Sequence, residues 1–212
     1  PRSVELHVNL REENFRGLQL RDLTGFSERS RVIDVAGQPL RVPSLEDAFI
    51  HVCVHWACHW IERAARLNQL VDLDRFMRKY NSALDWPLIL RLSNEAHVTR
   101  FVYAAVEVVQ RAFDSPLPSA EVTAQLQAGC PPRLQRWIDR YALNDVAQLD
   151  YRRPDKGTAY VLTNLAAQSI GEKFGIVRYA LLPPRPFIML KYKLKHPWLA
   201  IPFYMPYILS RA

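Results

Sequence analysis

Apolar positions between 44 and 80 predict two helices around which the rest of the chain is expected to pack. In the first half almost every position is apolar, which is typical of a central helix buried on all faces. Ser44 is expected to cap this helix, with Asp47 three residues later as an acidic version of the capping box. The second half is amphipathic, and its apolar side chains should face the core: Leu67, Leu70, Val71, Leu73, Phe76 and Met77.

The residues ahead of this helix pair predict β-structure. Positions 4–10 alternate strictly between apolar and polar residues, which is the pattern of a half-buried strand. Glu5 and His7 share its polar face, which either faces solvent or lines a site. A hairpin is expected near 31–42 around Gly37, because glycine readily adopts the positive φ of a tight turn.

Further helices are expected after position 80. One should start at Cys130-Pro131-Pro132 and turn Leu134, Trp137, Ile138 and Tyr141 inward. A single long helix is expected from Thr158 to Leu182, although Gly171 and Gly175 weaken its middle. Together these elements predict an α+β fold that is mostly α, in which a small antiparallel β part is followed by a helical bundle.

The expected organisation is a β part at 1–43, a helical domain at 44–182 and a C-terminal segment at 183–212 that is rich in proline, aromatic and basic residues. This last segment either packs its aromatic rings on the core or lies on a membrane surface, with bases and rings at the level of the headgroups. The proline residues within it favour the first alternative, because they interrupt a clean amphipathic helix.

Composition adds only a little to this picture. The 212 residues, 49% of them apolar and 23% charged, suit an ordinary globular protein with a sizeable core. The net charge of +7 favours an anionic partner such as a nucleotide, a nucleic acid or a lipid headgroup. Cys53, Cys58 and Cys130 are expected to be reduced, and no signal peptide is visible, so we expect a cytoplasmic protein.

His51, His55 and His59 are four residues apart and share one face of the first helix. Neutral imidazoles one turn apart can converge on a metal ion. Three successive turns drift around the helix, however, and no nearby carboxylate or thiolate clearly completes the set, Asp47 being the best local candidate. The pattern therefore favours hydrogen-bonded core histidines over a metal site.

The order of several motifs resembles a known family. VELHVNL is followed by the hairpin, then by VPSLEDAFIHVCVHWACH, RLNQLVDLDRFM and LDWPLIL, and the chain ends in PPRPFIMLKYKLKHPWLAIPFYMPYILSRA. This series is similar to the bacterial family of uncharacterised nucleotidyltransferases, which is related to the polymerase-beta-like superfamily. The resemblance spans nearly the whole chain.

The resemblance implies a metal-dependent transfer of a nucleoside monophosphate from an NTP to an unknown acceptor. Such enzymes hold Mg²⁺ with three carboxylates, two from an Asp-x-Asp pair and a third from a neighbouring strand, and Glu5 matches the third position. The glycine-serine turn and the Asp-x-Asp pair that precede this strand in the family do not occur ahead of Glu5 in the 212 residues. We therefore expect residues 1–43 to be a partial catalytic palm and this chain alone to be an inactive fragment.

The resemblance also implies that the helices after the palm cover the nucleotide. His55, His59, Arg63 and Arg66 could face the triphosphate, and Asp72 and His7 could contact substrate; core packing and surface ion pairs are the alternative for each of them. A half palm would expose a strand edge, which favours pairing with a second chain. A nucleic-acid partner is not expected. The alternative function is a non-catalytic helical module that contacts a partner protein or a membrane surface.

Overall fold

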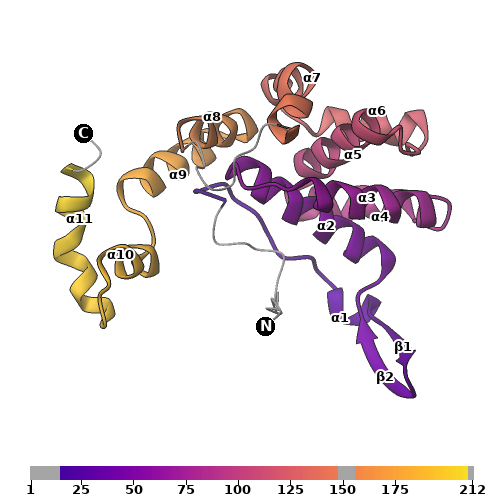
Figure 1. Cartoon of the computed structure of the whole chain (residues 1–212), viewed down its shortest axis with the longest axis horizontal. Helices are drawn as coiled ribbons and strands as arrows, with labels where there is room; N and C mark the ends of the chain where they lie inside the picture. The colour runs from indigo at the N-terminus through magenta and orange to yellow at the C-terminus, as the bar shows by residue number, and fades with distance from the viewer. Residues whose placement is uncertain (1–14, 148–155, 210–212) are drawn as a thin grey trace.

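The computed structural model describes residues 15–147 and 156–209. In this part of the chain, helices and one antiparallel two-stranded sheet form the mostly helical α+β fold expected from the sequence (Figure 1). The elements follow in the order α1 (Phe26–Arg29), β1 (Arg31–Val35), β2 (Gln38–Val42), α2 (Leu45–Ile61), α3 (Leu67–Tyr80), α4 (Trp86–Glu95), α5 (Thr99–Phe113), α6 (Ala120–Ala128), α7 (Pro132–Ala147), α8 (Lys156–Ala166), α9 (Ile170–Leu181), α10 (Arg185–Tyr192), η1 (Pro197–Leu199) and α11 (Ala200–Leu209).

Helices α2 and α5 form the centre of the bundle. Helix α2 packs against α3, α4, α5 and α8, and α5 packs against α3, α4, α6 and α7. The expectation of a central helix is confirmed, because α2 buries residues on several faces, including the stacked rings of Trp56 and Trp60, whose centroids are 5.4 Å apart. Its expected cap is also present, since Ser44 Oγ accepts a hydrogen bond from the Asp47 amide at 3.0 Å.

The hairpin is confirmed at the predicted place. Strands β1 and β2 pair from Arg31↔Val42 to Val35↔Gln38. The two turn residues between them both have positive φ, as in the tight turns that suit the twist of a hairpin. The hairpin projects from the start of α2 (Figure 1). Arg29 fixes its base, because the guanidinium donates to both oxygens of the buried Asp47 carboxylate, at 2.6 and 3.0 Å.

The prediction of one long helix from Thr158 to Leu182 is wrong. Helix α8 ends at Ala166, and α9 begins at Ile170 with Ser169 as its cap. Glycine is not the cause of the break, because Gly171 and Gly175 both lie inside α9. The chain turns between the two helices so that Glu172 can point into the core.

Glu172 and Arg100 form a buried ion pair between α9 and α5. Arg100 Nη2 lies 2.7 Å from Glu172 Oε1, and both side chains are almost completely buried. The same carboxylate accepts hydrogen bonds from the amides of Gln19, at 3.1 Å, and Gln168, at 2.7 Å. Burial lowers the pKa of Arg100, and the adjacent Glu172 carboxylate opposes that shift. The pair therefore joins three segments that are far apart in the sequence.

A glycine contact holds the segment around Gly17 against α9. Gly17 has a φ of +95°, and a Cβ on it would come within 2.3 Å of the Gly175 carbonyl carbon. A Cβ on Gly175 would come within 2.4 Å of the Gly17 oxygen. The two backbones can approach this closely only because neither residue has a side chain.

Two side chains expected to face the core are exposed instead. Leu67 is 58% exposed at the first position of α3, where the chain has only just left the preceding loop. Tyr141 is 40% exposed on α7 and packs its ring beside Trp137, with centroids 4.7 Å apart. Both residues lie at the edge of the apolar stripe of their helix. At such an edge, helical periodicity alone does not decide whether a side chain faces the core or the solvent.

The C-terminal aromatic rings pack mainly on one another rather than on the main core. Helices α10 and α11 enclose a separate small core of Ile188, Ala200 and Tyr207. The expectation that proline would interrupt the helix is wrong for Pro206, which lies inside α11. Among the described helices, none is both long and apolar enough to cross a membrane.

The first prediction concerns the glycine contact. Gly175→Ala should push residues 15–20 away from α9 and reduce the free energy of unfolding by about 2 kcal/mol, because backbone atoms cannot yield to the new methyl group. Gly171→Ala is the matched control, since its Cβ would meet only Ser169 Oγ at 3.6 Å and Gln19 Nε2 at 3.8 Å. It should stabilise the helix by about 0.5 kcal/mol. Urea denaturation of both variants checks this, and equal effects would contradict the packing described.

The second prediction concerns pH. Burial alone would raise the pKa of Asp74, but hydrogen bonds from Ser115 and Arg78 outweigh it and hold this pKa below its ordinary value of 3.8. A carboxylate with a lowered folded-state pKa stabilises the protein above the ordinary pKa, and this stabilisation is lost as the pH falls through the lowered value.

Ser115→Ala should therefore reduce the free energy of unfolding by about 1 kcal/mol at pH 7. The difference from the natural protein should shrink as the pH falls below about 4. Thermal unfolding from pH 3 to 7 measures this. A difference that stays constant over that range would show that Ser115 does not act through the Asp74 charge.

Candidate functional site

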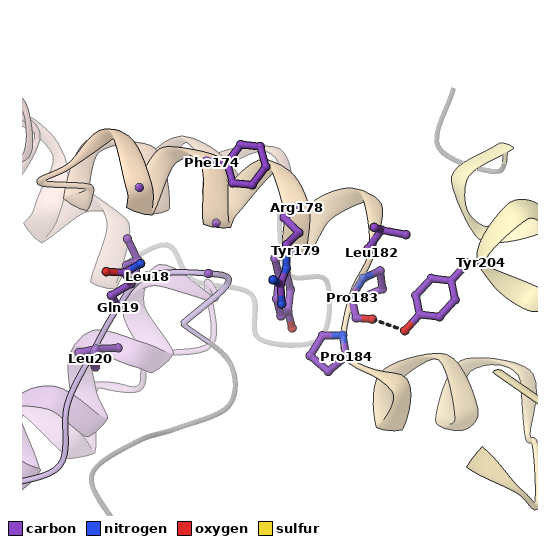
Figure 2. A pocket seen from close by; sticks show the side chains of 13 residues that line it. Leu18, Gln19, Leu20, Phe174, Arg178, Tyr179, Leu182, Pro183, Pro184 and Tyr204 are labelled. Carbon is purple, nitrogen blue, oxygen red and sulfur yellow. Dashed lines mark hydrogen bonds between the residues drawn. The ribbon is translucent and has the colours of Figure 1, made fainter. Parts of the chain in front are cut away.

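A groove of about 590 Å³ runs between the segment 17–20 and helix α9. Pro183, Pro184 and Tyr204 close one end of it, and Leu18, Gln19 and Leu20 lie toward the other (Figure 2). The Gly17–Gly175 contact and the Glu172 hydrogen bond to Gln19 set the position of its two walls. The groove is therefore built from the same contacts that attach α9 to the core.

Polar groups in the groove come from tyrosine, arginine and glutamine side chains. The Tyr204 hydroxyl donates to the Pro183 carbonyl oxygen at 2.7 Å, as Figure 2 shows. Burial raises the pKa of Tyr179, while Arg16 acts to lower it and Glu62 to raise it. Arg178 supplies a positive charge, and the described lining residues include no carboxylate. The groove is suited to a neutral or anionic ligand.

A ring contact links the segment beside the groove to the helical bundle. The Arg16 guanidinium lies 4.9 Å from the centre of the Tyr160 ring on α8, which itself packs against α2. Helix α8 thus lies between the start of the segment 17–20 and α2.

The three histidines of α2 form a row of touching rings. His51 and His55 are stacked with centroids 6.0 Å apart, and His55 and His59 meet edge to face at 4.5 Å. All three are half-buried. The rings contact one another along the helix instead of converging on one point.

The other candidates in the described part of the chain lie further along. Arg63 is half-buried and has a φ of 62°, at the turn where the chain leaves α2. Arg66 is exposed at the start of α3, and its amide donates to Gln69 Oε1 at 2.9 Å. Asp72 is exposed on α3, about 240° around the helix from Arg66, and has no ion pair with any described residue. The structure therefore groups His55, His59 and Arg63 near one end of α2, and it does not bring Asp72 to them.

Glu5 and His7 lie outside the described residues, as does the strand predicted at 4–10. Within 15–147 and 156–209, no group of three or more histidine, cysteine, aspartate or glutamate side chains could hold a metal ion. The described residues thus do not supply the carboxylates that Mg²⁺ requires. Burial raises the pKa of Cys130 to about 12 and raises that of Cys53 further, so neither thiol is a ready metal ligand.

The residues of the groove were missed from the sequence. The available signal was the spacing of Gly171 and Gly175, which places two residues without side chains on one face of a helix. That spacing allows another backbone to approach. Arg178 and Tyr204 gave no signal, because their part in the groove depends on how α9 and α11 pack.

Comparison with known proteins gives a family match for the first half of the chain. A search of curated proteins and a search of solved structures gave no match. A family model described as "Uncharacterised nucleotidyltransferase" matches residues 1–114, which run from the predicted N-terminal strand to the end of α5. The matched region includes Glu5, the histidine row and both arginines after it. The chain belongs to this uncharacterised nucleotidyltransferase family.

Proposed function

We propose that this protein takes part in the transfer of a nucleoside monophosphate from an NTP to an acceptor. The observation that supports the proposal is the family match over residues 1–114. In such a reaction an acceptor oxygen bonds to the α-phosphorus, the bond from that phosphorus to the β-phosphate oxygen breaks, and pyrophosphate leaves. The acceptor proton passes to a base or to solvent.

Glu5 is the proposed ligand for Mg²⁺, by its match to the third carboxylate of the family. Mg²⁺ in such enzymes neutralises the charge that develops on the phosphates. Two further carboxylates are needed, and the groove and the α2 histidines do not provide them among the described residues. We therefore propose that the two further carboxylates come from outside the described residues.

The described helices are proposed to hold the nucleotide. His55, His59 and Arg63 lie toward one end of α2, and a basic group there can bind phosphate oxygens through charge-assisted hydrogen bonds. Arg66 is exposed and can add a further contact. Asp72 is less well placed for this role, because it lies on a different side of α3.

The groove is the proposed place for the acceptor. It is open, and its described lining combines Arg178 with the hydroxyl groups of Tyr179 and Tyr204. Such a lining can orient a polar acceptor without competing for a metal ion.

The third prediction tests the assignment of Glu5. In the natural protein, Glu5→Ala should lower NMP transfer by about a hundredfold or more, because a carboxylate that holds the cation is lost. The fold should be unchanged, as measured by circular dichroism. Transfer is measured with α-labelled NTP, and titration calorimetry with Mg²⁺ and a non-hydrolysable NTP measures binding.

Glu28→Ala is the matched control, since Glu28 is an exposed carboxylate on α1 within the same matched region. It should leave transfer unchanged. Full activity of Glu5→Ala would contradict the role of Glu5. Absence of NTP binding and of transfer in the natural protein would contradict the proposed function itself.

A further inference from the structure

The C-terminal hairpin, defined here as α10, η1 and α11 (residues 185–209), has a core of its own. Ile188, Ala200 and Tyr207 are buried in it, and the rings of Tyr192 and Phe203 pack with centroids 4.9 Å apart. It lies at the end of the molecule opposite the hairpin of β1 and β2 (Figure 1). It also lies beyond residues 1–114, which match the nucleotidyltransferase family. Apart from Tyr204, which lines the groove, its residues have no part in the transfer reaction proposed above.

The outer face of the C-terminal hairpin is apolar. Trp198, Ile201, Met205 and Leu209 recur every three or four residues from η1 into α11, so they share one helical face. Their exposed fractions are 67, 59, 64 and 69%. No exposed position of α11 carries a polar side chain. Contiguous apolar surface of this kind usually marks a site that binds a partner or a membrane.

Helix α9 carries a second exposed apolar stripe. Ile170, Phe174 and Val177 are 86, 70 and 54% exposed and follow one another at helical spacing. Leu190, in α10, is 82% exposed. Exposed apolar residues thus occur on α9, α10 and α11 alike.

The same region is strongly basic. Between Ile170 and Leu209 the only acidic residue is Glu172, and it is buried in the ion pair with Arg100. Six basic side chains are exposed there, and no ion pair joins any of them to another described residue: Lys173, Arg178, Arg185, Lys191, Lys193 and Lys195. Lys191 Nζ lies 4.5 Å from the centre of the Tyr207 ring, which keeps its charge beside α11.

We infer that the C-terminal hairpin docks on an anionic lipid surface. Protein–protein interfaces are depleted in lysine, whereas interfacial helices combine lysine with apolar and aromatic residues. The ten-residue helix α11 is about 15 Å long, half the thickness of a bilayer core of about 30 Å, so it lies along the surface. Trp198, Ile201 and Met205 enter the acyl boundary, and the lysines contact headgroup phosphates.

The experiment is co-sedimentation of the full chain with vesicles. Vesicles rich in phosphatidylglycerol should bind it at low salt, and vesicles of phosphatidylcholine alone should not. Ile201→Ser with Met205→Ser should weaken binding by roughly tenfold or more. Lys193→Gln with Lys195→Gln should weaken it by roughly thirtyfold. All four positions are exposed, and circular dichroism checks that the variants fold.

Matched control pairs carry the same changes elsewhere. Val32→Ser with Leu40→Ser replaces apolar residues that are 63 and 51% exposed on the β-hairpin, and Arg136→Gln with Arg140→Gln removes two exposed charges from α7. Both should bind vesicles as the natural chain does. Equal losses in the controls, or no binding to anionic vesicles, would overturn the inference.

The same variants also test whether a second copy of the chain or an RNA binds the C-terminal hairpin instead of lipid. A dimer in solution that dissociates with Ile201→Ser and Met205→Ser would show that a second copy covers it, and this would overturn lipid docking. Binding of single-stranded RNA that Lys193→Gln and Lys195→Gln abolish, with vesicle binding unchanged, would overturn it as well. Either result would leave the proposed transfer reaction standing, because the matched region does not include this hairpin.

Discussion

The buried ion pair of Arg100 and Glu172 is the interaction on which the arrangement of this protein depends. It lies between the central helix α5 and the first turn of α9, and the Glu172 carboxylate also accepts the amides of Gln19 and Gln168. Taking both charges out of water is costly, and only this dense set of hydrogen bonds offsets the cost. The pair therefore anchors the first turn of α9 to the bundle.

The family match and the exposed apolar and basic surface belong to different parts of the chain. The family match covers the part from the N-terminus to α5, where a rigid core supports the histidines and arginines of α2 and the loop after it. The C-terminal hairpin has its own small core and exposes apolar and basic residues. The groove lies between them, so a protein held at a lipid surface by its C-terminal region would keep the groove near that surface. This placement of the groove near a membrane rests on both the proposed transfer reaction and the proposed docking on lipid.

Sequence reasoning predicted the parts of the fold that local pattern determines. The cap at Ser44, the turn at Gly37 and the apolar character of α2 each follow from a few neighbouring residues. It failed between Thr158 and Leu182, where Ser169, which caps α9 by accepting from the Glu172 amide, was not recognised as the start of a second helix. Helical periodicity alone also cannot assign residues at the edge of an apolar stripe, such as Tyr141. The groove as a whole was not predictable, since it exists only through packing.

Hydrogen exchange of Glu172→Gln, read by mass spectrometry, tests most directly whether this ion pair holds the groove together. The account predicts that residues 15–20 and α9 both exchange faster than in the natural protein, by about a hundredfold, because both lose the same anchor. Helices α2 and α3 should keep their protection. Faster exchange of α9 alone, or unchanged exchange of both segments, would contradict the claim that Glu172 joins them.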